Sequence, residues 1–125
     1  MKIAFLSSIY PAHAEKIYRD NPNLKDKSSD EQMEFIHLHA LSSYTKWNDY
    51  FGSQGFEVLQ FHHNLTYVES KWAEENYFTP TKKNDVLQIG LEKVKKFQPD
   101  ILYCSSPLFY LQSNFLAELI NLLPK

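Results

Sequence analysis

The chain has 125 residues and a mass of 14.7 kDa, the size of a single domain. Its hydrophobic fraction of 43%, with nine Phe, eight Tyr and two Trp, excludes a disordered chain and predicts a globular one. The formal net charge of −2 offers no long-range attraction to nucleic acid or to an anionic membrane, so we expect no nucleic-acid partner.

The chain has one cysteine, Cys104, which excludes an internal disulfide and the zinc motifs that need paired thiolates. A single thiol is typical of a reducing compartment. No stretch of the sequence approaches the ~18 consecutive apolar residues of a membrane-spanning helix. We therefore expect a soluble, cytoplasmic protein with no integral membrane segment.

The first part of the chain predicts a strand followed by a loop. Residues 2–7 form a short apolar run without polar alternation, which is typical of a strand buried on both faces. Residues 11–29 contain two prolines and many charges and show no clean period. We predict a long loop there, with one helical turn around Glu15–Tyr18.

One long amphipathic helix is predicted next. Two overlapping capping boxes in Ser28–Gln32 indicate its start, and Gly52 and Gly55 indicate its end. Between these signals, apolar residues recur at intervals of three and four and form one stripe: Met33, Ile36, Ala40, Tyr44, Trp47 and Phe51.

The second half of the chain predicts two strands and three helices. The strands are Phe56–Phe61 and Ile101–Cys104. A short helix is expected around Val68–Ala73, a second one begins after the capping residues Asn84 and Asp85, and a final helix covers Phe115–Leu123. Three lysines fall in the last turn of the second of these helices, where they interact favourably with its dipole: Lys93, Lys95 and Lys96.

The alternation of strands and helices predicts an α/β fold, a Rossmann-like three-layer sandwich with a short parallel sheet of strand order 2-1-3. Residues 1–125 should form one such domain. Because three strands are few for this kind of sheet, we expect the domain to be the N-terminal part of a longer two-domain protein. Six strand residues should be nearly fully buried: Ile3, Phe5, Val58, Leu59, Ile101 and Leu102.

In an open parallel sheet, ligands bind beyond the carboxyl ends of the strands, where the strand order reverses. This point is predicted between Ser7-Ser8 and Ser105-Ser106, although solvated loops would be polar at these positions too. His13 follows the first strand and is a candidate general base near neutral pH, or else an exposed loop histidine. Tyr10 can stack on a sugar or pack against the helices.

Several ligands of this architecture are excluded. None of the three glycines lies near the end of the first strand, so neither a dinucleotide nor a P-loop phosphate site is present, and we expect no cofactor. His37 and His39 lie about 200° apart around a helix. His62 and His63 are neighbours on a strand and point to opposite faces. We therefore expect no metal site.

Several segments resemble the opening of bacterial glycosyltransferases with the two-domain GT-B architecture. The residues that carry the resemblance are Met1–Pro11, Tyr18–Leu24, Ser28–Gln32, Gly55–Val58 and Gln98–Tyr103. The segments are short and are spread over most of the length of the chain, between residues 1 and 103. The sequence departs from the family in lacking a Gly-rich loop after the first strand and the acidic motif of the donor domain.

The resemblance implies the acceptor-side N-terminal domain of an enzyme that transfers a sugar from a nucleotide-sugar donor to a carbohydrate acceptor. The donor domain would lie outside this chain, so the chain by itself should be inactive, and the family needs no protein-bound metal. His13 would accept the proton of the acceptor hydroxyl, and five residues would bind the acceptor: Ser7, Ser8, Tyr10, Ser105 and Ser106. The alternative is a non-catalytic, flavodoxin-like binding or protein-interaction module.

Overall fold

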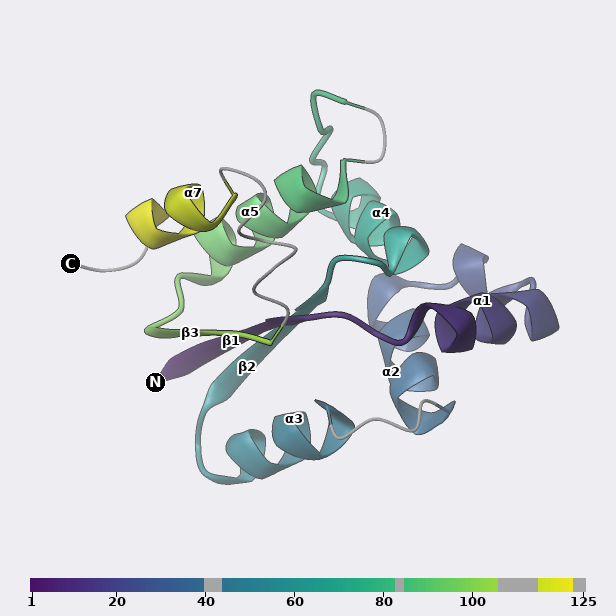
Figure 1. The fold of residues 1–125 in the computed structure, drawn as a ribbon, viewed down its shortest axis with the longest axis horizontal. Coiled ribbons are helices and arrows are strands. Elements are labelled where there is room, and N and C mark those ends of the chain that lie inside the picture. Colours follow the sequence, from purple (N-terminus) through teal and green to yellow (C-terminus); the bar gives the residue numbers. More distant parts are fainter. Residues whose placement is uncertain (40–43, 83–84, 106–114, 123–125) are drawn as a thin grey trace.

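A computed structural model of the chain describes residues 1–39, 44–82, 85–105 and 115–122 (Figure 1). Three parallel strands form one sheet in the order β2-β1-β3: β1 (Lys2–Ser7), β2 (Glu57–His62) and β3 (Ile101–Cys104). Ser7 pairs with His62 across the β1–β2 ladder, and Phe5 pairs with Tyr103 across the β1–β3 ladder. The predicted fold class and strand order are confirmed.

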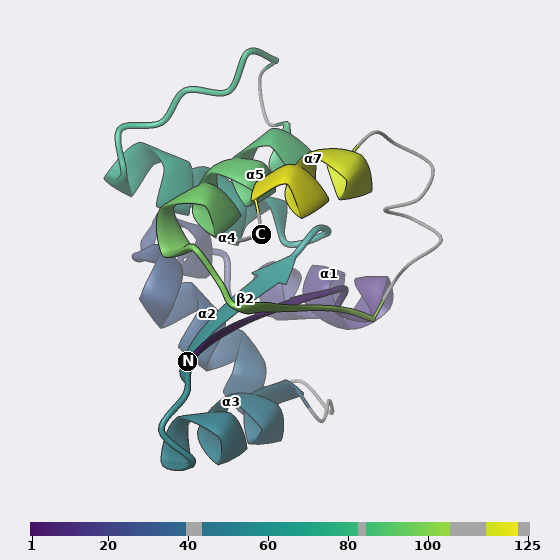
Figure 2. The same cartoon turned by 90° about the vertical axis from the view of Figure 1, so that its left-hand side faces the viewer.

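Helices cover both faces of the sheet. Helix α3 (Tyr44–Ser53) packs on one face, and α5 (Val86–Phe97) and α7 (Phe115–Leu122) lie on the other (Figure 2). Three more helices lie at the carboxyl ends of the strands: α1 (Pro11–Asp20), α2 (Ser29–His39) and α4 (Thr66–Glu75). The predicted helices in the second half of the chain are therefore confirmed.

The predicted loop at residues 11–29 is wrong, because the segment forms α1 and a short 3-10 helix, η1 (Leu24–Asp26). Pro11 occupies the first turn of α1, where its fixed φ favours a helix and its missing N–H costs nothing. Ala14 and Ile17 are buried on the inner face of α1. Glu15 and Lys16 lie between these two residues, and such charged residues made the helical period hard to recognise in the sequence.

The predicted long helix is two helices, α2 and α3, with residues 40–43 outside the described ranges. Helix α2 packs against α4, whereas α3 packs against β2, so the two helices contact different parts of the molecule. The predicted start at Ser28–Ser29 and the predicted end at Gly55 are confirmed, whereas Gly52 lies inside α3 and does not end it. The Glu31 N–H donates to Ser28 Oγ over 3.2 Å, and Gly55 follows α3 with a φ of +86°, which favours glycine.

The second predicted capping box, Ser29 with Gln32, is wrong. The Ser29 hydroxyl instead donates to Glu75 Oε1 of α4 over 2.5 Å. Gln32 is buried and satisfies its side chain elsewhere, accepting from the Tyr18 hydroxyl and donating to the carbonyl of Lys27. These bonds join α2 to its neighbours α1 and α4, because a buried amide must find partners.

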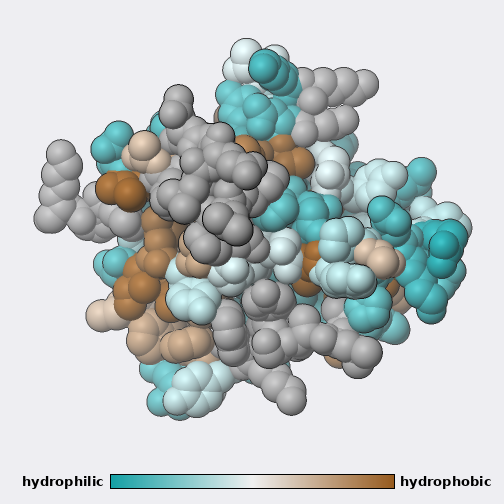
Figure 3. Space-filling model, in the orientation of Figure 1, coloured by the Kyte–Doolittle hydropathy of each residue, from teal (hydrophilic) through white to brown (hydrophobic). Residues whose placement is uncertain are grey.

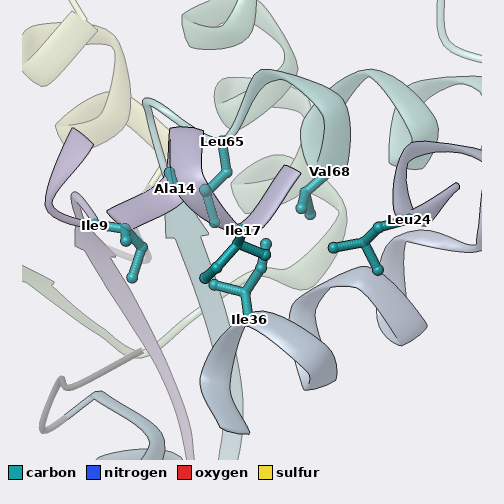
Figure 4. Close-up of a cluster of buried hydrophobic side chains, with 7 residues drawn as sticks. All are labelled: Ile9, Ala14, Ile17, Leu24, Ile36, Leu65 and Val68. Atoms are coloured by element: carbon teal, nitrogen blue, oxygen red, sulfur yellow. The ribbon is translucent and has the colours of Figure 1, made fainter. Parts of the chain in front are cut away.

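Two apolar clusters hold the layers together. One lies beyond the strand ends, where α1, α2 and α4 meet (Figure 4), and consists of Ile9, Ala14, Ile17, Leu24, Ile36, Leu65 and Val68. The other lies between the sheet and the α5–α7 layer and consists of Ala4, Leu6, Phe61, Val94, Phe115 and Leu119. A Cβ at Gly90 of α5 would come within 2.6 Å of the Phe61 ring, so this close approach requires glycine.

The burial predicted for the strands holds for β1 but not for its neighbours. Ile3 and Phe5 are buried, whereas Val58, Leu59 and Leu102 are half-buried and Ile101 is 41% exposed. The reason is position, because β1 alone has a described strand on each side. Exposed hydrophobic surface gathers over the β3 and α7 side of the molecule, while the α1 side is hydrophilic (Figure 3).

Substituting Phe5→Ala should lower the free energy of unfolding by about 3–5 kcal/mol. The side chain is 4% exposed and contacts the rings of Phe51 and Tyr103, so its removal leaves a cavity in the sheet. Urea denaturation gives the measurement. The control is Ile101→Ala on the exposed strand, for which we expect a much smaller loss. Equal losses would contradict the central position of β1.

Candidate functional site

Ser7 and His62 end the two neighbouring strands β1 and β2 and are joined by a hydrogen bond. Because they pair in register, both side chains leave the same face of the sheet. Ser7 Oγ lies 2.8 Å from His62 Nδ1, and both residues are buried. Ser7 therefore lies inside the protein, where it orients His62. Ser8, the next predicted acceptor-binding residue, is half-buried.

Tyr10 and His13 lie together at the start of α1, not in a loop. Tyr10 is the N-cap residue and is 72% exposed, and its carbonyl accepts from the His13 N–H over 3.0 Å. The half-buried His13 ring meets the Tyr10 ring edge-on, with 6.1 Å between centroids. The two predicted residues thus form one aromatic pair after β1, with Tyr10 exposed and His13 half-buried.

Ser105 lies beside the end of β1, as the predicted strand order requires. Its N–H donates to the Leu6 carbonyl over 2.9 Å. Its hydroxyl is buried and has no hydrogen-bond partner among the described residues. Ser106 lies outside the described residues. The structure thus brings Ser7 and Ser105 to adjacent strand ends.

A cavity of about 390 Å³ opens at the carboxyl end of β2, between α1 and the turn that leads into α4. The rings of Tyr18 and Tyr67 lie in its wall with 4.8 Å between centroids. Asn64 and Thr66 supply an amide and a hydroxyl, and three charged residues complete its polar part: Glu15, Arg19 and Lys25. None of the predicted site residues lines this cavity, although Ala14 in its wall follows His13 in α1.

Asn64 fastens the loop after β1 to the loop after β2. Its Oδ1 accepts from the Ile9 N–H over 3.0 Å, and its Nδ2 donates to the Ile9 carbonyl. This two-bond clamp fixes the direction in which the chain enters α1. It therefore positions Tyr10 and His13 relative to the cavity.

A second polar group lies on the α2 side of the sheet, where the His62 ring faces that of His37. The two Nε2 atoms are 3.5 Å apart and the rings are almost perpendicular, at 89°. Burial, followed by the charge of His37, lowers the pKa of His62 to about 3. Burial also lowers the pKa of His37, against the opposing effect of Asp49. Both rings are therefore neutral near pH 7.

A buried ion pair joins α4 to α5. Lys93 Nζ lies 2.9 Å from Glu69 Oε2, and the two side chains are 5% and 0% exposed. Lys93 also lies over the Trp72 ring, 5.5 Å from its centroid. Burial raises the pKa of Glu69, and the Lys93 charge opposes that shift. The sequence predicted only that Lys93 interacts with the dipole of its helix, and it did not predict this contact with Glu69.

No helix in the described part of the chain is long and apolar enough to cross a membrane. The same residues contain no group of three or more His, Cys, Asp or Glu side chains that could hold a metal ion.

Substituting Lys93→Met should lower the free energy of unfolding at pH 7 by about 3–5 kcal/mol, because it leaves a buried carboxylate without its partner. The loss should shrink as the pH falls, since protonation of Glu69 removes the unpaired charge. Adding Glu69→Gln should recover much of the stability. Lys96→Met, on the exposed side of the same helix, is the matched control. A loss no larger than that control would contradict a structural role for the pair.

The stability of the protein should fall between pH 6.5 and pH 4. The pKa of about 3 for folded His62 lies below the ordinary 6.5, so the unfolded chain binds a proton that the folded chain does not. At pH 5 this difference lowers the free energy of unfolding by about 2 kcal/mol relative to pH 7. His37 and His63, whose pKa values are also lowered, act in the same direction.

Denaturation at several pH values measures this slope. His62→Gln should flatten the slope and His39→Gln, at an exposed ring, should not. A slope unaffected by His62→Gln would show that the ring is already charged or exposed in the folded protein.

Comparison of the chain with protein-family models, with curated proteins and with solved structures found no match. The proposal for function therefore depends on the geometry of the site and on the opening segments of the sequence.

Proposed function

We propose that the chain is the acceptor-side N-terminal domain of a glycosyltransferase with the GT-B architecture, acting on a carbohydrate. The observation that carries the proposal is the cavity at the carboxyl end of the sheet, with two tyrosine rings beside an amide and a hydroxyl. Aromatic rings cover the apolar faces of sugars, while amides and hydroxyls pair with sugar hydroxyls. The nucleotide-sugar donor would bind to a second domain outside this chain.

The Tyr10–His13 pair supplies the group that the reaction needs. Attack by an acceptor hydroxyl requires a base that takes its proton, and an imidazole is suited to this near neutral pH. His13 is half-buried in the first turn of α1, and the next residue, Ala14, lines the cavity. An acceptor in the cavity that extends along α1 would bring a hydroxyl to His13. Ser7 is buried, so its role in this proposal is indirect.

Acceptor binding can be tested on the chain itself. In an NMR titration with mono- and oligosaccharides, we expect shifts at Tyr18, Asn64 and Tyr67. Tyr67→Ala should weaken or abolish binding, whereas Tyr77→Ala, at a ring that is 97% exposed and outside the cavity wall, should not. If the NMR signals of β3 shift when a protein partner is added, and no signal shifts when sugars are added, the alternative of a protein-interaction module is favoured.

In the full-length protein, His13→Ala should lower the rate of sugar transfer by ~10²–10⁴-fold, the usual contribution of a general base. Its melting temperature should change little, because His13 lies in the first turn of α1 and its ring meets the ring of the exposed Tyr10 edge-on. The measurement is nucleotide release from the donor in the presence of an acceptor, with His39→Ala as the control. Unchanged transfer by the His13 variant would exclude the catalytic role.

A further inference from the structure

The cavity between α1 and the turn into α4 carries more positive than negative charge. Its charged wall residues are two cations, Arg19 and Lys25, and one anion, Glu15. All three residues are exposed. Because the whole chain has a net charge of −2, this local excess of positive charge is opposite in sign to the overall composition. The cavity therefore favours a ligand that carries a negatively charged group.

Neither cation is held in a strong ion pair within the described part of the chain. Lys25 takes part in no ion pair there. The Nε atom of Arg19 lies 3.7 Å from the neighbouring Asp20, and Asp20 is shared with Lys16 at 3.6 Å. Such exposed pairs contribute little free energy, so both cations can turn to a ligand. A guanidinium and an ammonium are the side-chain groups that bind carboxylates and phosphates best.

One buried amide fixes the aromatic wall of the cavity and the segment that carries Lys25. The side chain of Gln32 accepts from the Tyr18 hydroxyl over 2.7 Å and donates to the Lys25 carbonyl over 3.2 Å. Gln32 is fully buried, so these bonds have no competition from solvent. The Tyr18 ring and the cationic edge of the cavity thus keep fixed relative positions. One ligand in the cavity can therefore contact the ring and the cations together.

Resting on the sugar-binding function proposed above, we infer that the sugar bound in this cavity is acidic, a uronic acid or a sugar phosphate. Its carboxylate or phosphate oxygens accept hydrogen bonds from Arg19 and Lys25. The rings of Tyr18 and Tyr67 cover the apolar face of the sugar. Glu15 lies one helical turn before Arg19 and repels the anion, which directs the charged substituent towards Lys25.

The test is a series of sugars that differ at one exocyclic carbon. Glucose, glucuronic acid and glucose-6-phosphate carry a hydroxyl, a carboxylate and a phosphate there, and NMR titration of the chain gives a Kd for each. Both acidic sugars should bind more tightly than glucose, and the difference should shrink as the salt concentration rises, because salt screens exposed charges. Inorganic phosphate is the fourth probe, and it should bind more weakly than glucose-6-phosphate because it makes no contact with the tyrosine rings.

Variants of the charged wall residues separate their roles. Arg19→Gln and Lys25→Gln should each weaken binding of the acidic sugars about 3–10-fold and leave glucose binding unchanged. Glu15→Gln should strengthen binding of the acidic sugars, because it removes a repelling charge. Lys16→Gln is the matched control, since Lys16 is an exposed lysine of the same helix that does not line the cavity. Its affinities should equal those of the wild type.

Three results would overturn the inference, and one of them also contradicts the proposed function. Equal affinities for glucose and the acidic sugars, or equal losses in the Lys16 and Arg19 variants, would exclude an acidic ligand and leave the sugar-binding cavity standing. Inorganic phosphate that binds as tightly as glucose-6-phosphate would show that the sugar ring contributes nothing. Absence of binding by every sugar at millimolar concentration would contradict the sugar-binding function itself, and the inference with it.

Discussion

Strand β1 is paired along both of its edges, and this pairing sets the order and the register of the whole three-stranded sheet. Its partners are distant in sequence: Ser7 bonds a residue 55 positions away, and Lys2 bonds Asp100 at a separation of 98. The parallel register places Ser7 beside His62 and Phe5 beside Tyr103. Because such non-local contacts must close long loops, the sheet should form late and cooperatively. A shift of one residue would turn Ser7 and His62 to opposite faces.

Three hydrogen-bonded polar pairs each join two elements, and two of these pairs are buried. Ser7 and His62 join two strands, Lys93 and Glu69 join α4 to α5, and Ser29 and Glu75 join α2 to α4. A buried polar group costs free energy unless it is bonded, so each pair penalises any packing in which its elements are displaced. Apolar contacts alone would tolerate such displacements more easily. The polar pairs therefore favour one arrangement of the helices at the carboxyl end of the sheet, where the cavity lies.

The sequence predicted the sheet well because its signals are local. Short apolar runs that end in polar residues mark all three strands, and alternation with helices implies the parallel order. The cap of α5 was also readable, since Asp85 accepts from the Gln88 N–H as its position suggests. Helix α1 was missed because its buried face is narrow. The division between α2 and α3 was missed because the apolar period continues from one helix to the next in the sequence, although the two helices pack on different elements.

The site was predictable only in part, for a related reason. The strand-end rule correctly brought Ser7 and Ser105 to neighbouring positions, but it says nothing about which side chains point inward. The cavity depends on how α1 packs against the turn before α4, and α1 itself was not expected. Lys93 and the His37–His62 pair depend on contacts between elements, and no spacing within one element reveals such contacts. Lys93 comes three residues after Gly90, so helical spacing could have predicted that it lies near the buried face of α5. Spacing could not have predicted that Glu69 of α4 is its partner.

The contact between Gly90 and the Phe61 ring links two positions in evolution. The ring occupies the space that a side chain on α5 would need, so neither residue can change independently. A smaller residue at position 61 would permit alanine at position 90, and the alanine would then strengthen the helix. Homologous chains should therefore show correlated exchanges, either glycine with an aromatic ring or alanine with a small aliphatic residue. Replacing both residues together, with a small aliphatic residue at position 61 and alanine at position 90, is therefore a way to stabilise the protein. Either substitution alone should destabilise it.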